Sequence, residues 1–183
     1  MKRNKMYLGL VHYPVLNKKN EIITTSITNL DIHDISRSCI TYGVKKFFMI
    51  NPLSGQKKLL EKICTFWKSD IAKKYNSDRV EALFIIQYAE TIEKCISEIE
   101  NQEKEYPIVV TTTASTMKGQ IANNELYSDR PILLLFGTGN GLAEQVHKEA
   151  DYVLKPITGL GKYNHLSVRS AVAIILDRLN SEK

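Results

Sequence analysis

Three segments in the second half of the sequence combine glycine, hydroxyl and other small residues in a way that suits ligand binding. Residues 111–115 read TTTAS, residues 137–142 read GTGNGL, and residues 155–161 read KPITGLG and lead to NHLS at 164–167. Glycines at alternate positions mark either a tight reversal of the chain or a close approach of backbone to a ligand. Because three such segments occur together, the sequence predicts a ligand-binding site.

The glycine segment matches neither of two common nucleotide signatures. Its third glycine follows the second by two residues rather than three, and no acidic ribose partner stands about 20 residues further on, so it is not the dinucleotide fingerprint. It also lacks the Gly-Lys-Ser/Thr that closes a phosphate-binding loop.

Strands and helices alternate along the chain, and this pattern predicts where the three segments lie. Short apolar runs that read as buried strands occupy residues 6–11, 46–50, 83–87, 108–112, 132–136 and 152–154. Segments with helical spacing separate them, and helices are expected at 142–150 and 168–179. We therefore predict one α/β domain over residues 1–183, with a mainly parallel sheet and helices on both faces. In such sheets ligands bind beyond the carboxyl ends of the strands, where all three segments would lie.

The overall composition is that of an ordinary globular protein. The chain has 183 residues, of which 43% are hydrophobic and 25% charged, which argues against disorder, collagen-like repeats or a coiled coil. Its longest apolar runs, at 132–136 and 171–176, fall far short of the roughly 20 residues that a membrane span needs. The apolar stretch at 6–11 continues into His12-Tyr13-Pro14 without a small-residue cleavage site. We expect a cytoplasmic protein without a membrane span.

The cysteines and the charge narrow the chemistry further. Cys39, Cys64 and Cys95 form no Cys-x-x-Cys pair and have no histidine at ligand spacing, so we expect buried thiols and no metal site. The formal net charge is +5, and several lysines occur as doublets. This charge permits a polyanionic partner, although it is also compatible with a role in solubility alone.

In order and spacing, the last two segments resemble the SPOUT, or trefoil-knot, RNA methyltransferases. The matching text is FGTGNGL at 136–142, LKPITG at 154–159 and HLSVRSAVAI at 165–174. The overall sequence is most similar to stand-alone bacterial SPOUT proteins associated with tRNA guanine-N1 methyltransferases. The resemblance implies S-adenosylmethionine as cofactor, a C-terminal trefoil knot, a homodimer, and an RNA substrate, with tRNA as the first candidate and rRNA as the second.

A further stretch, DIHDISRSCITYGV at 31–44, is similar to the first motif of the ribose 2'-O-methyltransferase branch. The similarity makes Arg37 the catalytic candidate and ribose 2'-O-methylation the main hypothesis. A guanidinium stays protonated, so Arg37 would bind a phosphate and stabilise a developing alkoxide rather than accept a proton. This sequence departs from that branch at Asp31, where the branch has Asn, at Thr138, where it commonly has Glu, and at His165-Leu166-Ser167.

Three alternatives remain open at this point. The first is methylation of a base nitrogen, with Asp31 or Asp34 as the proton acceptor. The second is an RNA-binding knot protein without catalysis, which Thr138 makes conceivable. The third is a flavodoxin-like nucleotide binder, which fits the strand alternation but not the last two segments.

The resemblance and the loops together assign the site residues. Cofactor contacts are predicted for Thr112, Phe136, Gly137, Thr138, Gly139, Lys155, Ile157, Gly159 and Leu166. Substrate contacts are predicted for Asn164, His165 and Arg169. His12 follows the first predicted strand and is interpreted as structural.

Overall fold

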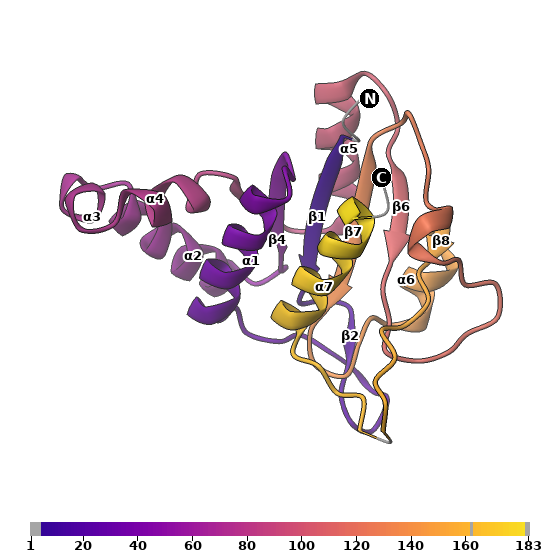
Figure 1. The fold of residues 1–183 in the computed structure, drawn as a ribbon. Helices are drawn as coiled ribbons and strands as arrows, with labels where there is room; N and C mark the ends of the chain where they lie inside the picture. The colour runs from indigo at the N-terminus through magenta and orange to yellow at the C-terminus, as the bar shows by residue number, and fades with distance from the viewer. Residues whose placement is uncertain (1–4, 162, 182–183) are drawn as a thin grey trace.

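The computed structural model describes residues 5–161 and 163–181. Six parallel strands form one sheet in the order β5-β4-β1-β7-β6-β8 (Figure 1). Their bounds are β1 (Met6–Val11), β4 (Lys46–Ile50), β5 (Ile86–Ala89), β6 (Ile108–Thr111), β7 (Ile132–Gly137) and β8 (Tyr152–Val153). The predicted parallel α/β sheet is therefore confirmed. β1 and β7 lie at the centre of the sheet. Their side chains are buried from Met6 to Val11 and from Ile132 to Phe136, because helices cover both faces of the sheet.

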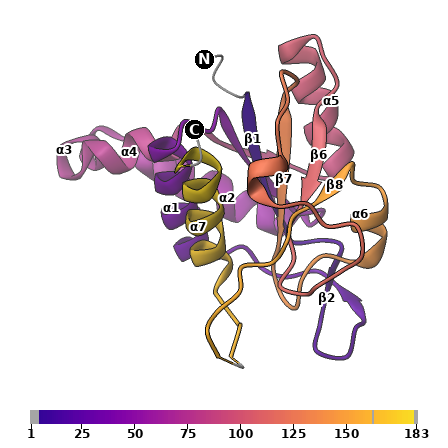
Figure 2. The ribbon, with the colours of Figure 1, turned by 45° about the vertical axis from the view of Figure 1, so that its right-hand side comes forward.

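Helices cover both faces of the sheet, as predicted. The helices are α1 (Asn29–Thr41), α2 (Ser54–Trp67), α3 (Asp70–Tyr75), α4 (Ser77–Leu83), α5 (Ile92–Glu103), α6 (Glu144–Lys148) and α7 (Val168–Ser181), with a 3-10 turn η1 (Asn123–Glu125). Side chains of β1 alternate between two cores: Leu8 and Leu10 pack with α1 and α7, whereas Tyr7 and Val11 pack with α5 and α6. Figure 2 shows α5 and α6 on the opposite side of the sheet from α1 and α7.

Two predicted boundaries are wrong. The strand predicted at 83–87 begins only at Ile86, because Val80, Ala82 and Leu83 form the buried face of helix α4. The helix predicted at 142–150 is limited to α6, because Leu142 forms an isolated bridge with Val15 and stays extended.

A short antiparallel hairpin, which the sequence did not predict, follows β1. Its strands are β2 (Val15–Leu16) and β3 (Ile22–Ile23). Strands of two residues show no periodicity, so the sequence pattern could not reveal them. The hairpin lies at the carboxyl end of the sheet, next to the loop that follows β7 (Figure 1).

The segment at 154–159, one of those that resemble the knot, lies against the loop after β6. Lys155 N donates to Ile121 O (2.8 Å), and the Gln120 side chain donates to Leu154 O (3.2 Å), so the loop after β6 is held against the segment after β8. The threading that makes a trefoil knot stays a prediction from the resemblance. The assignment of all of residues 1–183 to one domain stays a prediction from the alternation of strands and helices.

The described part of the chain agrees with the expected cysteine chemistry. Cys39 and Cys95 are buried and Cys64 is half-buried, and all three are free. Burial raises the pKa of each of these thiols, which keeps them protonated. Among the described residues no three His, Cys, Asp or Glu side chains are grouped to hold a metal ion. No helix in these ranges combines the length and hydrophobicity that would carry it across a membrane.

Glu103, in the last turn of α5, connects that helix to the start of β1. Its carboxylate accepts hydrogen bonds from Tyr7 Oη (2.5 Å) and Lys45 Nζ (2.6 Å), and it forms an ion pair with Lys5 (2.8 Å). Burial alone would raise the pKa of Glu103, but the hydrogen bonds from Lys45, Lys5 and Tyr7 outweigh burial and lower the pKa to about 2. Because the pKa is depressed, the stabilisation is present above pH 4.5 and is lost as the pH falls toward 2.

We predict that Glu103→Gln lowers the free energy of unfolding at pH 7 by about 1–3 kcal/mol, since it removes hydrogen bonds to a charged acceptor. The difference from wild type should shrink between pH 4.5 and pH 2. Urea denaturation at several pH values measures it, and a difference that stays constant down to pH 2 would contradict the role of the charge.

Candidate active site

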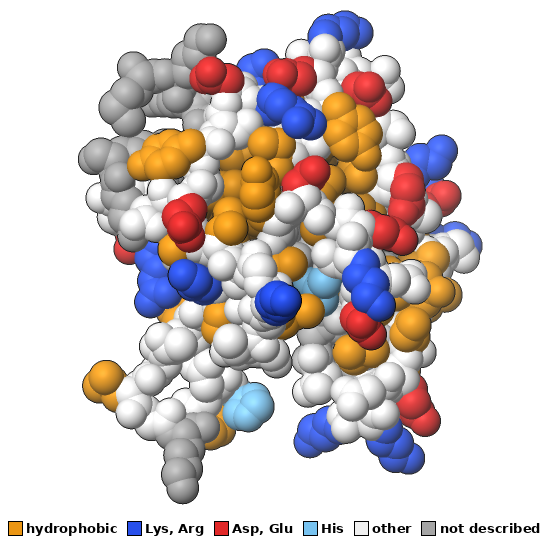
Figure 3. All heavy atoms as spheres, turned by 90° about the vertical axis from the view of Figure 1, so that its right-hand side faces the viewer, with side chains coloured by type: hydrophobic (Ala, Val, Ile, Leu, Met, Phe, Trp, Pro, Cys, Tyr) orange, Lys and Arg blue, Asp and Glu red, His pale blue; other side chains and the backbone are white. Residues whose placement is uncertain are grey.

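A cavity of about 530 Å³ lies beyond the carboxyl ends of β1, β6 and β7. Five parts of the chain line it: residues 112–115 after β6, residues 136–141 at the end of β7, residues 157 and 164–167 before α7, residues 168, 171 and 175 of α7, and residues 25, 26, 28 and 31 before and within α1. In Figure 3 a notch separates two projections at the lower end of the molecule. The three segments predicted from the sequence thus meet at one edge of the sheet, around a space of the size that small-molecule sites have.

The glycine loop after β7 folds back across the end of β1. Gly139 has a φ of +60°, and a Cβ on Gly139 would lie 2.8 Å from Leu16 O. A Cβ on Gly137 would lie 2.6 Å from Leu142 N. Backbone bonds join the loop to the hairpin, from Asn140 N to Leu16 O (2.7 Å) and from Leu16 N to Gly141 O (2.9 Å). The glycines are therefore required by the packing of the chain on itself.

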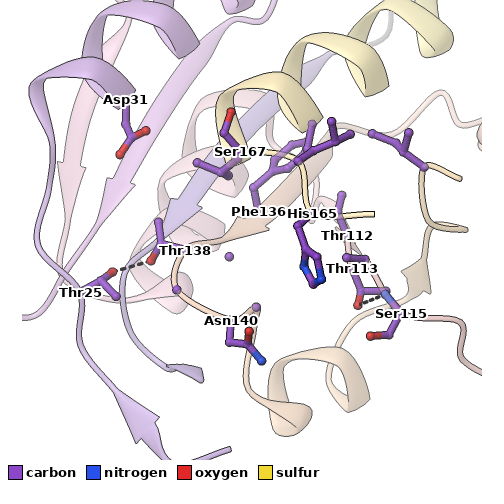
Figure 4. A pocket seen from close by; sticks show the side chains of 18 of the residues that line it. Thr25, Asp31, Thr112, Thr113, Ser115, Phe136, Thr138, Asn140, His165 and Ser167 are labelled. Atoms are coloured by element: carbon purple, nitrogen blue, oxygen red, sulfur yellow. Dashed lines mark hydrogen bonds between the residues drawn. The ribbon is translucent and has the colours of Figure 1, made fainter. Parts of the chain in front are cut away.

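A partly buried chain of hydrogen bonds supports this loop. His12 Nδ1 contacts Thr25 Oγ1 (2.9 Å), Thr25 Oγ1 contacts Thr138 Oγ1 (2.5 Å), and Thr138 Oγ1 donates to Val11 O (3.0 Å). Each hydroxyl has one proton, so all three bonds form at once only if His12 carries its proton on Nδ1 and donates to Thr25. Thr25 and Thr138 also line the cavity (Figure 4).

His12 itself is fully buried, and burial lowers its pKa to about 4. The imidazole is therefore neutral at physiological pH, and its single proton lies on Nδ1 when the three hydrogen bonds form together. The structural interpretation of His12 agrees with this environment. Thr138, which stands where the ribose branch commonly has Glu, forms hydrogen bonds with Thr25 and with Val11 O at the end of β1.

The segment before α7 closes the other side of the cavity. Asn164 Nδ2 donates to Ile157 O (2.9 Å) and Asn164 Oδ1 accepts from Gly159 N (3.3 Å), so this side chain holds the loop in shape. Ser167 Oγ accepts from Ser170 N (3.2 Å) and so caps the start of α7. Figure 4 shows the His165 ring lying in the cavity region between Thr113 and Asn140.

The structure brings most of the predicted cofactor residues to this cavity. Seven of the nine line it: Thr112, Phe136, Gly137, Thr138, Gly139, Ile157 and Leu166. Lys155 and Gly159 do not line it, and both are exposed. Of the predicted substrate residues, Asn164 and His165 line the cavity.

One wall of the cavity was not predicted from the sequence except for Asp31, which is one of the two alternatives for a proton acceptor. Thr25, Ser26, Thr28 and Asp31 line it from the segment that leads into α1. The run TTSIT at 24–28 has the same hydroxyl-rich character as TTTAS at 111–115, and that was the available signal. The run at 24–28 was not assigned to the site because the sequence pattern predicts no strand directly before it.

Arg37 and Arg169 lie outside the cavity, in a neighbouring groove between α1 and the start of α7. Asp34, Arg37, Ser38, Thr41 and Tyr42 line the groove from α1, and Ser167, Arg169, Ser170 and Ala173 line it from α7. Ser167 lines both the groove and the cavity, so the two spaces adjoin. The catalytic and phosphate-binding role expected of Arg37 therefore stays a prediction, and the structure places its side chain in the groove beside the cavity.

Asp31 stands where the cavity and the groove meet. It is only 8% exposed, and its Oδ2 accepts a hydrogen bond from Thr28 Oγ1 (2.6 Å). Arg169 forms ion pairs with Asp31 Oδ1 (3.8 Å) and with Asp34 Oδ2 (3.6 Å). Arg169 in the groove thus contacts Asp31 at the cavity and also Asp34, whose side chain is half exposed.

Comparison with known proteins identifies the chemistry. The family described as SAM-dependent RNA methyltransferase matches residues 5–181. The chain belongs to this family. It is therefore an S-adenosylmethionine-dependent RNA methyltransferase, which confirms the SPOUT resemblance and sets aside the flavodoxin-like and non-catalytic alternatives.

Two sequence relatives and one solved structure show the range of similarity. An uncharacterized protein of Aquifex aeolicus is 38% identical over 186 residues, which cover 99% of this chain and 91% of the relative. The tRNA (guanine-N(1)-)-methyltransferase of Oleidesulfovibrio alaskensis is 40% identical over 95% of this chain, but the chain spans only 41% of that protein. A structure described as giving insights into 2-OH methylation of C/U34 on tRNA has a TM-score of 0.61 at 15% identity, covering 97% of this chain and 95% of the other.

The cavity suits the cofactor of this family. Phe136, Ile157, Leu166 and Ile175 give it apolar walls for an adenine ring, and the loop at 137–141 presents backbone polar groups. Thr112 can accept but not donate a hydrogen bond there, because its hydroxyl proton already goes to Leu135 O (3.0 Å).

We predict that Gly139→Val abolishes the rise in melting temperature that S-adenosylmethionine produces in the wild type. The new side chain would meet Leu16 O and would force the loop away from the hairpin. Gly55→Ala in α2 is the control, since its Cβ meets nothing within 4 Å. An unchanged shift in a folded Gly139→Val protein would remove this loop from the cofactor site.

Proposed function

We propose that this enzyme methylates a base nitrogen of tRNA, with N1 of guanine as the target, and that Asp31 accepts the proton from that nitrogen. The observation that carries the proposal is the position of Asp31. Among the described residues it is the only acidic side chain that lines the cofactor cavity. Its ion pair with Arg169 connects it to the groove.

The chemistry of guanine N1 requires such a group. This nitrogen carries a proton at neutral pH, so it becomes a good nucleophile only as that proton leaves. S-adenosylmethionine, when bound, supplies an electrophilic methyl carbon and leaves as a neutral sulfide. As N1 forms its bond to this carbon, the N1 proton moves to a carboxylate oxygen of Asp31. Arg169 then holds Asp31 in place, and Thr28 fixes the orientation of its second oxygen.

The relatives support the same target. At 40% identity, the relative from Oleidesulfovibrio alaskensis is named for guanine-N1 methylation of tRNA. Because this chain spans only 41% of that protein, the carry-over of its activity is part of the proposal. The structural neighbour with 2-OH methylation, at 15% identity, supports the fold rather than a target atom.

Arg37 and Arg169 give the groove a binding role. Both guanidinium groups lie on the same groove, which leads to the cavity at Ser167. Arginine forms bidentate hydrogen bonds with phosphate, so the groove suits the backbone on either side of the target nucleotide. Arg37 therefore keeps the phosphate-binding role expected from the sequence, outside the cofactor cavity.

Ribose 2'-O-methylation stays the second candidate, because Arg37 occupies the position of the catalytic arginine in the motif at 31–44. In that case the guanidinium would stabilise the developing alkoxide, and its removal would slow transfer by about 10²–10³. The two candidates differ in their product. A 2'-O-methylated nucleotide resists alkaline cleavage at its 3' side, whereas a methylated base leaves that linkage cleavable.

We predict that Asp31→Asn keeps S-adenosylmethionine and tRNA binding but lowers single-turnover methyl transfer by at least about 10²-fold, the lower end of a general-base contribution. The matched control is Asp34→Asn, which weakens the second ion pair of Arg169 and leaves the carboxylate in the cavity in place. The product should be 1-methylguanosine in an alkali-cleavable linkage. A product that resists alkali, together with a collapse of transfer in Arg37→Ala, would refute the base-nitrogen proposal.

A homodimer in the cytoplasm, where tRNA is found, completes the proposal. In α7, Val172, Ile175 and Leu176 pack inside the chain and are not available to a partner. α1, however, exposes Leu30 and Ile40 beside the groove. We predict a species of twice 20.8 kDa in sedimentation velocity at micromolar concentration. A single species of 20.8 kDa would contradict the dimer.

A further inference from the structure

Three consecutive helices, α2, α3 and α4, fill the connection between β4 and β5 and project sideways from the sheet (Figures 1 and 2). In α2 only Leu60 is buried, and in α3 only Ala72. A connection between neighbouring parallel strands needs one helix to cover the sheet. The surface that these additional turns expose is therefore available for another role.

The exposed side of α2 carries an ordered row of side chains. Lys58, Lys62 and Phe66 follow one another at intervals of four residues, so they share one face of the helix, and all three are exposed. Within the described residues, neither lysine lies within 4 Å of a carboxylate. Like charges four residues apart repel each other and weaken a helix. The row is therefore unfavourable for the isolated helix and suits a negatively charged partner.

The rest of the projection repeats this combination of basic and aromatic residues. Residues 54–83 contain seven Lys or Arg against four Asp or Glu. Phe66, Tyr75 and Phe84 are 56%, 79% and 61% exposed, and Tyr75 directly follows two lysines. Lysines that contact phosphates, combined with exposed rings on which unpaired bases stack, are the features of proteins that bind RNA loops.

The projection lies where an RNA bound at the active site could reach it. α1 packs against α7 on one side and α4 on the other, so the groove with Arg37 and the projection occupy the same side of the sheet (Figure 1). At its start, α2 contacts the wall of the cavity, because Gln56 Oε1 accepts a hydrogen bond from Ile27 N (2.7 Å).

We propose that α2, α3 and α4 form an RNA-binding arm that holds the body of the substrate RNA while the target nucleotide enters the cavity. The proposal rests on RNA as the substrate and is independent of the atom that is methylated. Phosphates contact Lys58 and Lys62, and unpaired bases stack on Phe66 and Tyr75.

The test compares two double variants that remove the same charge. Lys58→Ala with Lys62→Ala changes the arm, and Lys94→Ala with Lys148→Ala changes exposed lysines on α5 and α6, on the opposite face of the sheet. Binding of tRNA and of a structured ribosomal RNA fragment is measured by fluorescence anisotropy over a range of salt concentrations. Calorimetry with S-adenosylmethionine and single-turnover transfer at saturating tRNA accompany these measurements.

We predict that the arm variant binds tRNA about tenfold more weakly at low salt. Its slope of log K against log salt should become shallower by about one for each phosphate that the protein no longer neutralises. Phe66→Ala and Tyr75→Ala should each weaken binding by several-fold without changing the slope, since stacking releases no ions. The control variant should change affinity by less than about twofold, and cofactor affinity and the single-turnover rate should not change in any variant.

Three results would overturn the proposal. The arm and control variants could weaken tRNA binding equally, which would leave only a general effect of charge. Wild type could bind neither RNA. Phe66→Ala and Tyr75→Ala could instead shift sedimentation to a smaller species while tRNA affinity stays the same, which would make the projection an interface between two copies of the chain. None of these results depends on whether the product is a methylated base or ribose.

Discussion

The site depends on one packing constraint at the centre of the sheet, where the loop after β7 crosses the end of β1. Neither Gly137 nor Gly139 has room for a side chain, because Gly139 lies against the hairpin and Gly137 lies against the loop's own backbone at Gly141 and Leu142. Beneath it, the fully buried His12 stays neutral and connects through Thr25 to Thr138. Because the hairpin, β1 and the loop are joined by hydrogen bonds, the cavity has a rigid floor before any ligand binds, which reduces the entropic cost of binding.

The sheet and the glycine loop could be predicted because their signals are local. Residues 132–136 are a continuous apolar run followed by glycines, which is typical of a buried parallel strand and the turn after it. The hairpin could not be predicted, since Val15–Leu16 and Ile22–Ile23 are too short to show a period. Thr25 and Thr28 were missed with it, because their position in the cavity depends on where the hairpin sends the chain.

Helix geometry explains why we propose Asp31 rather than Arg37 as the group that accepts the proton. Asp31, Asp34 and Arg37 are spaced three residues apart in α1, and each step of three turns the side chain by about 60° around the helix axis. Asp31 therefore lines the cavity, whereas Arg37, about 120° further round, lines the groove. Sequence spacing indicated that all three residues lie near the site, but only the orientation of α1 relative to β7 separates the carboxylate from the guanidinium.

A crystal structure with S-adenosylhomocysteine, the demethylated product of the cofactor, tests the proposed site most directly. We expect the adenine to lie between Ile157 and Leu166, the loop at 137–141 to contact the ribose or the adenine, and the sulfur to face the side of the cavity where Asp31 and Ser167 stand. A ligand bound elsewhere, or a sulfur that points away from Asp31 and the groove, would contradict both the cofactor site and the role of Asp31.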